Sequence, residues 1–265
     1  MLTSNMAPID LYFEVHGETG YPVLLMHGFL SSRAHWIPNL PALIDNGFRP
    51  IVLELLGHGN SNTPDAPEQY HPQHYVQQFE AIRETLGIER WLLCGQSLGA
   101  ALVLNYAYTC PERTTALAFT NSRAVMMEPT ERKEALEAFQ REVAEKGQRI
   151  IAESPMNPAR SRRLRADIKA LLMAHNAQMS LSAYENAMCH TVPYAGVKHR
   201  LKDNTCPALH VFGQRERTFQ ADRDYIAEHM ANCQVVDLEH AGHAVNLDDA
   251  EGFNQAVITF FKKQI

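Results

Sequence analysis

The chain has 265 residues, of which 45% are apolar and 20% are charged, and these fractions exclude wholesale disorder and fibrous repeats. At roughly 100–200 residues per domain, the length fits one large domain or one domain that carries an insertion. The formal net charge of −6 argues against nucleic-acid or anionic-membrane binding, because such partners attract proteins with an excess of Lys and Arg.

The cysteines are scattered along the chain, and no two of them form a Cys-x-x-Cys pair. They are Cys94, Cys110, Cys189, Cys206 and Cys233. This pattern argues against a disulfide scaffold and a thiolate zinc site, and it is typical of a reducing compartment. The N-terminus lacks the apolar core of a secretory signal, and no apolar run approaches the ~20 residues of a membrane span. We therefore expect a cytoplasmic protein, whose oligomeric state the sequence does not indicate.

Short apolar runs alternate with amphipathic runs over the first 120 residues. The apolar runs lie at 22–27, 49–55 and 90–95, and the runs with helical spacing lie at 34–46, 71–86 and 98–108. Strands that are apolar throughout are typical of a parallel sheet covered on both faces. The alternation therefore predicts an α/β fold, with a mostly parallel central sheet flanked by helices. Residues 11–17 predict an additional antiparallel strand at the edge of this sheet.

A helical insertion is expected after the strand predicted at 114–122. Little strand pattern is present from 123 to 202, where helices are expected at 129–146, 158–173 and 180–190. The alternation resumes with strands at 208–213 and 234–239 and helices at 220–230 and 248–263. We therefore expect an α/β core formed by 1–122 and 203–265, with a helical cap, or lid, at 123–202.

The run Gly95-Gln96-Ser97-Leu98-Gly99 carries the clearest chemical signal. It follows a predicted buried strand and precedes a predicted helix, as the Gly-x-Ser-x-Gly pattern requires. A sharp turn in this place exposes the Ser97 hydroxyl, and the glycines avoid collisions with neighbouring elements. Ser97 is therefore the predicted nucleophile. The backbone N–H of Leu98, at a helix N-terminus, is one predicted donor of an oxyanion hole.

Two further loops supply the expected partners of Ser97. His27-Gly28-Phe29 ends a predicted strand, and the Phe29 N–H is the candidate for the second oxyanion donor. The alternative is an ordinary glycine turn at a strand end. His243 follows the last predicted strand on a loop and is the candidate general base. Its spacing from His240 does not require a metal site, because we expect His240 to face solvent.

These motifs together resemble the α/β-hydrolase superfamily, in particular its small esterases and lactonases with a helical cap. The shared landmarks are HGF at 27–29, GHGNS at 57–61, GQSLG at 95–99, FGQRE at 212–216 and GH at 242–243, in the family's order and spacing. The resemblance implies a Ser–acid–His catalytic triad in this chain order. Such a triad needs neither a metal nor an organic cofactor.

The acid of the triad departs from the family pattern. Family members usually carry Gly-x-x-Asp after this strand, whereas Glu216 occupies the matching position here. Glutamate can orient the imidazole as aspartate does, but its longer side chain demands a shifted loop. Asp222 and Asp224 are expected too far along the next helix, and Asn121 fills the alternative acid position of some relatives. We assign Glu216 as the acid; the alternative is a surface charge between two arginines.

Three other features of the sequence have a structural interpretation, and two of them also have a functional one. Glu54 stands where relatives commonly carry Asp, and we expect it to be paired inside the protein. Methionines in the cap suit either helix packing or an adaptable apolar pocket. They are Met126, Met127, Met156, Met173, Met179 and Met188. The arginines Arg160, Arg162, Arg163 and Arg165 are expected on a solvated helix face, or else they recognise an anionic substrate.

The sequence thus predicts a serine hydrolase, of the carboxylesterase kind, that cleaves a small-molecule ester or lactone through an acyl-enzyme. One alternative is a lactonase or a C–C bond hydrolase or lyase with the same triad. Another is a non-catalytic ligand-binding protein of this fold. A dehalogenase or an epoxide hydrolase is disfavoured, because relatives of those kinds carry Asp at the position of Ser97.

Overall fold

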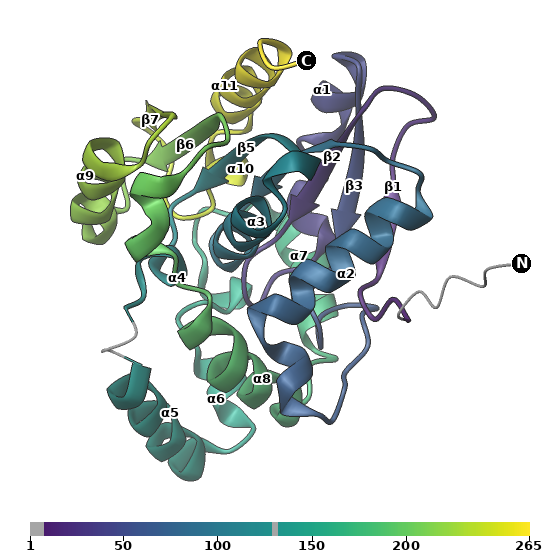
Figure 1. Ribbon diagram of the computed structural model, residues 1–265. Coiled ribbons are helices and arrows are strands. Elements are labelled where there is room, and N and C mark those ends of the chain that lie inside the picture. Colours follow the sequence, from purple (N-terminus) through teal and green to yellow (C-terminus); the bar gives the residue numbers. More distant parts are fainter. Residues whose placement is uncertain (1–7, 129–131) are drawn as a thin grey trace, which may run out of the picture.

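The structure is a computed structural model that describes residues 8–128 and 132–265, and a seven-stranded sheet runs through this part of the chain (Figure 1). The strands are β1 (Phe13–Val15), β2 (Tyr21–Met26), β3 (Phe48–Leu53), β4 (Trp91–Gly95), β5 (Thr114–Thr120), β6 (Ala208–Gly213) and β7 (Cys233–Leu238). Their order is β1-β3-β2-β4-β5-β6-β7. Strand β1 is antiparallel to β3, and all the other neighbours are parallel. The predicted α/β fold and its antiparallel edge strand are confirmed.

Helices cover both faces of the sheet. On β2, Leu24 and Met26 belong to a buried cluster that includes side chains of α2 (Pro72–Thr85) and α3 (Leu98–Thr109), the two helices in front of the sheet in Figure 1. Val23 and Leu25 belong to a second cluster, which includes side chains of α1 (Leu40–Asp45) and α11 (Ala250–Lys262). Side chains alternate between the two faces of a strand, so a sheet buried on both faces requires strands that are apolar throughout.

A long helical segment connects β5 to β6. Its helices are α4 (Arg123–Met126), α5 (Arg132–Lys146), α6 (Arg149–Glu153), α7 (Ala166–Asn176) and α8 (Leu181–Asn186). Helices α5, α6 and α8 lie together at the lower left of Figure 1, away from the sheet. The described part of 123–202 contains no strand, while the division into a core and a cap stays a prediction. The predicted start of a helix at Pro129 lies outside the described residues.

Two of the predicted helices are wrong, because in the structure a turn or a loop interrupts each of them. The helix predicted at 34–46 is a 3₁₀ turn, Arg33–Trp36, followed by α1. Pro38 lies between them, and a proline has no N–H to donate to a continuous helix. The helix predicted at 158–173 is a turn at Pro158–Arg160 and then a loop that leads to α7.

Ser161 explains the second interruption. Its Oγ atom accepts the backbone N–H groups of Arg163 and Leu164, both at 3.3 Å. Such side-chain bonds offer the backbone an alternative to the helical ladder. The arginines at 160, 162, 163 and 165 therefore lie in a turn and loop ahead of α7, and the expected helix face is wrong. No helix among the described residues combines the length and apolar character needed to cross a membrane.

Candidate active site

Ser97 lies at a sharp turn between β4 and α3. Its backbone has φ 53° and ψ −117°, a conformation that is strained for any residue with a Cβ atom. Two glycines allow the turn to close. A Cβ atom on Gly95 would overlap the carbonyl oxygen of Gly99, and one on Gly99 would overlap the carbonyl oxygen of Met26. The glycine spacing seen in the sequence is therefore a steric requirement of this turn.

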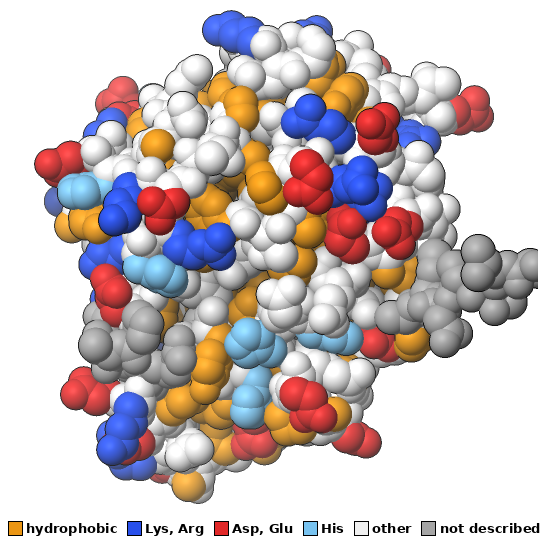
Figure 2. Space-filling model, viewed as in Figure 1, with side chains coloured by type: hydrophobic (Ala, Val, Ile, Leu, Met, Phe, Trp, Pro, Cys, Tyr) orange, Lys and Arg blue, Asp and Glu red, His pale blue; other side chains and the backbone are white. Residues whose placement is uncertain are grey.

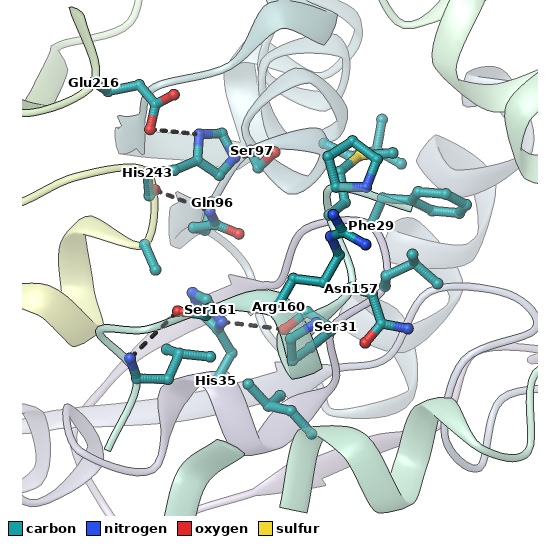
Figure 3. A pocket seen from close by; sticks show the side chains of 18 of the residues that line it. Phe29, Ser31, His35, Gln96, Ser97, Asn157, Arg160, Ser161, Glu216 and His243 are labelled. Carbon is teal, nitrogen blue, oxygen red and sulfur yellow. Dashed lines mark hydrogen bonds and ion pairs between the residues drawn. The ribbon is translucent and has the colours of Figure 1, made fainter. Parts of the chain in front are cut away.

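His243 lies on the loop between β7 and α10 (Val245–Asp248), and its Nε2 atom is 2.9 Å from the Oγ atom of Ser97 (Figure 3). This hydrogen-bond distance is what proton transfer from the hydroxyl to the imidazole requires. Gln96 fixes the loop, because its side-chain Nε2 donates to the carbonyl oxygen of His243 at 3.2 Å. Sequence reasoning missed this bond, since Gln96 fills a variable position of the pattern. His240 is exposed, as expected.

Glu216 follows β6, and its Oε2 atom lies 3.9 Å from the Nδ1 atom of His243. That is an ion-pair distance, about 1 Å longer than a hydrogen bond. The other acids considered from the sequence lie on α9 (Gln220–His229), where Asp224 pairs with Arg223 at 3.2 Å. Asn121 is buried and accepts the Gly213 N–H at 3.1 Å, so it joins the ends of β5 and β6. Of these candidates, Glu216 is the one placed against Nδ1 of His243.

The pKa of His243 lies below its usual value of 6.5, because partial burial of the ring disfavours the charged imidazolium. The carboxylates of Glu216 and Asp248 raise this pKa, but they do not outweigh the desolvation. The imidazole is therefore neutral at pH 7 and able to accept a proton. Sequence reasoning missed Asp248, for which no motif exists. Its Oδ2 atom accepts the Gly242 N–H at 2.7 Å and lies 3.8 Å from Arg163.

The backbone amides of Phe29 and Leu98 are the predicted oxyanion donors, and both residues line the same pocket as Ser97. Neither amide donates a hydrogen bond to another described residue, so both are available to a ligand. Gly28 allows the first loop to approach the nucleophile, because a Cβ atom on Gly28 would lie 2.8 Å from the Cβ atom of Ser97. The structure thus brings together the residues predicted from the sequence, whose catalytic roles stay predictions.

Buried polar residues support the oxyanion loop from behind. The Nε2 atom of His58 accepts the N–H of Leu30, 3.1 Å away, at a residue with φ 51°. Burial lowers the pKa of His58 to about 4, which keeps the ring neutral and able to accept this bond. Glu54 is fully buried, pairs with Arg33 at 2.9 Å and accepts the Asn60 N–H at 2.7 Å. The expected internal pairing of Glu54 is confirmed.

A cavity of about 600 Å³ opens beside Ser97 (Figure 3). Phe29, Leu98 and Phe219 contribute apolar walls from the α/β part of the chain, and residues of the segment 155–164 face them. Of the six cap methionines, all of which the structure describes, Met156 alone lines this cavity. A methionine-lined pocket is therefore not formed. Within the described residues, no group of three His, Cys, Asp or Glu side chains is arranged to hold a metal ion.

Comparisons with known proteins identify the family of this fold. A sequence profile of the alpha/beta hydrolase fold matches residues 21–250. The chain belongs to the alpha/beta hydrolase family. It is 26% identical over 254 residues to the carboxylesterase YbfK of Bacillus subtilis (strain 168), a match that covers 90% of this chain and 79% of YbfK. The predicted family is confirmed.

Two solved structures are similar to this chain in fold. A bromoperoxidase from Bacillus anthracis superposes with a TM-score of 0.81, at 23% identity and with 97% of each chain covered. A thermophilic esterase from Thermogutta terrifontis superposes with a TM-score of 0.75, at 26% identity, covering 96% of this chain and 93% of that one. The first likeness supports the alpha/beta hydrolase fold alone.

Proposed function

We propose that this alpha/beta hydrolase cleaves a carboxylic ester of small or medium size through a Ser97–His243–Glu216 triad. The observation that carries the proposal is the 2.9 Å contact between Nε2 of His243 and Oγ of Ser97 at a strained turn. Ser97 has φ 53° and ψ −117°, and backbone strain of this kind is common at functional sites. The names of the carboxylesterase and esterase relatives support the same class of reaction.

In the proposed first step, Nε2 of His243 takes the proton from Ser97 as Oγ attacks the ester carbonyl carbon. The carbonyl oxygen becomes an oxyanion, which accepts hydrogen bonds from the amides of Phe29 and Leu98. Glu216 stabilises the imidazolium that forms. When the tetrahedral intermediate collapses, the bond to the alcohol oxygen breaks, and His243 gives its proton to that oxygen.

The second step releases the acid. His243 removes a proton from water, the resulting hydroxide attacks the acyl-enzyme, and Ser97 leaves with the proton from His243. A lactone is an internal ester and would open by the same steps, with the alcohol still attached to the acid. We propose that residues 123–202 act as the cap, because their segment 155–164 faces Ser97 across the cavity. A volume of about 600 Å³ is within the usual range for small-molecule pockets.

The test is hydrolysis of p-nitrophenyl esters from acetate to dodecanoate by wild type, Ser97→Ala and Ser182→Ala. Ser182 is an exposed serine on α8 and serves as the matched control. We expect Ser97→Ala to lose turnover on every ester, whereas Ser182→Ala keeps it. The chain length with the highest kcat/KM then measures the acyl pocket. Equal rates for wild type and Ser97→Ala on all these esters would contradict an esterase.

A further inference from the structure

The cavity beside Ser97 has a charge opposite to that of the chain as a whole. Four arginines and two carboxylates line it, an excess of two positive charges in a chain whose net charge is −6. On the face drawn in Figure 2, by contrast, basic and acidic side chains are interspersed. A positive cleft in an acidic protein raises the local concentration of anionic ligands.

Both carboxylates of the cavity are already engaged. Glu216 lies against His243 at 3.9 Å, and Asp248 accepts the Gly242 N–H and lies 3.8 Å from Arg163. Arg123 lies 3.9 Å from Asp222. The side chains of the two remaining arginines, Arg160 and Arg162, make no ion pair with any described residue. Because His243 is neutral, Glu216 keeps its negative charge. The two exposed side chains of Arg160 and Arg162 exceed it and leave the cavity with a net positive charge.

The loop that carries these two arginines is held in place by its own side chains. Asn157 accepts the Ala159 N–H at 2.9 Å and donates to the Ile151 carbonyl oxygen at 3.0 Å. At the other end Lys169 donates to the carbonyl oxygen of Ser161 at 2.7 Å. Bonds of this kind reduce the conformational freedom that a ligand would otherwise have to remove on binding.

A small apolar cluster anchors the same loop to the rest of the protein. Leu164 packs with Ile168 and Leu172 of α7 and with Ala34 and Leu247 from the α/β part of the chain. The loop is thus fixed between the cap and the core. In Figure 3 the Arg160 side chain lies among the residues that line the pocket, well apart from the Glu216–His243 pair.

We propose that Arg160 and Arg162 form an anion subsite and that the substrate is an ester that also carries a carboxylate. This inference rests on the proposed function, since it names the substrate class of the same site. A guanidinium presents its N–H donors in a planar fork that matches the two oxygens of a carboxylate. With the ester carbonyl at Ser97, the carboxylate of the substrate lies at the cap side of the cavity.

The experiment compares esters that differ only in charge. One pair is the mono-p-nitrophenyl ester of adipic acid and its terminal amide, and the second pair is 4-acetoxybenzoate and 4-acetoxybenzamide. The first pair places the carboxylate on the acyl part and the second on the alcohol part. Rates of spontaneous release in buffer are subtracted. The quantity compared is the charge preference, the ratio of kcat/KM for the carboxylate over kcat/KM for the amide.

In at least one pair we expect wild type to prefer the carboxylate by roughly three- to tenfold, because both guanidinium groups are exposed and solvent weakens each ion pair. The double variant Arg160→Ala/Arg162→Ala should bring this charge preference close to one. Arg165→Ala is the matched control, because Arg165 pairs with Asp167 at 2.6 Å and does not line the cavity. It should keep the wild-type charge preference. Free adipate should inhibit wild type more strongly than adipamide does. In the double variant the two compounds should inhibit equally.

The outcomes separate the two proposals. Hydrolysis that depends on Ser97 but shows no charge preference in either pair would overturn the anion subsite and leave the esterase intact. A charge preference that survives in the double variant would also overturn it. If none of the four esters is hydrolysed faster by wild type than by Ser97→Ala, the proposed function fails, and the anion subsite fails with it.

Discussion

The two halves of the site are held in different ways. The nucleophile half, residues 27–30 and 95–99, is packed into the core, and its Phe29 and Leu98 are only 7% and 3% exposed. The acid–base half consists of Glu216 and His243 on their loops, with side chains 26% and 40% exposed. Glycines without space for a Cβ atom shape the backbone of both halves. The side chains of Glu216 and His243, however, are held by one hydrogen bond to Ser97, one from Gln96 to the His243 carbonyl oxygen and one long ion pair.

This difference separates two kinds of substitution. Changes in the nucleophile half disturb packing, so they are expected to reduce the stability of the fold together with activity. Changes in the acid–base half remove charges and proton acceptors from partly exposed loops. They are expected to reduce activity while the free energy of unfolding stays nearly the same.

The largest effect is expected from the base. Replacing His243 by Ala should lower kcat by about 10⁵–10⁶-fold, because no other group can take the Ser97 proton. The thermal midpoint of unfolding should change little. The control is His240→Ala, an exposed histidine three residues earlier, which should keep full activity. Activity lost equally in both variants would show that the loop, and not the imidazole, matters.

Glu216→Gln is expected to have the next largest effect, a loss of roughly 10²–10⁴-fold in kcat/KM. The amide keeps the size of the side chain but cannot stabilise the imidazolium. Asp224→Asn on α9 removes a carboxylate from the same segment, which pairs with Arg223 away from His243, and should leave the rate unchanged. Wild-type kinetics in Glu216→Gln would exclude this residue from the triad.

In the nucleophile half, Gly99→Ala should lower the free energy of unfolding by about 2–3 kcal/mol, because the new methyl group overlaps two backbone carbonyl oxygens. Urea unfolding measures the change. Gly147→Ala is the comparison, since Gly147 has φ 53° but open space around its Cβ position. Conformational strain alone should cost about 1 kcal/mol there. An equal or smaller effect at Gly99 would remove the steric explanation of the turn.

The smallest effect concerns the pH dependence of kcat/KM. Because His243 acts in its neutral form, the rate should rise with pH through the pKa of His243, which lies below 6.5. The Asp248 carboxylate raises this pKa, so Asp248→Asn should move the acid limb to lower pH by a fraction of a unit. Asp224→Asn should leave the limb in place. A shift to higher pH in Asp248→Asn would contradict the assigned sign.

The nucleophile half could be predicted well from the sequence. Local sterics decide it, and Gly95, Ser97 and Gly99 stand in one short run between a strand and a helix. The same holds for the central strands β2 and β4, which are apolar throughout and contribute side chains to the buried clusters on both faces of the sheet.

The acid–base half and the cavity wall could be predicted only in part. The 3.9 Å separation of Glu216 from His243 depends on the conformations of two loops that are far apart in the sequence. Asp248 comes near His243 through tertiary structure alone. The sequence predicts a helix at 158–173, whereas the structure has a turn and a loop ahead of α7 there. Asn157, just before that stretch, and Ser161 within it are turn signals, because their side chains accept the backbone N–H groups of Ala159 and Arg163 in place of helical bonds.

The most direct test of the central claim is the labelling of the protein by a fluorophosphonate, followed by intact-mass measurement and peptide mapping. If His243 activates Ser97 as proposed, wild type gains one adduct per chain, located on Ser97, and loses esterase activity in step with labelling. His243→Ala should react far more slowly, and Ser97→Ala should gain no adduct. Wild type that stays unlabelled, or an adduct on another residue with Ser97 free, would contradict the triad.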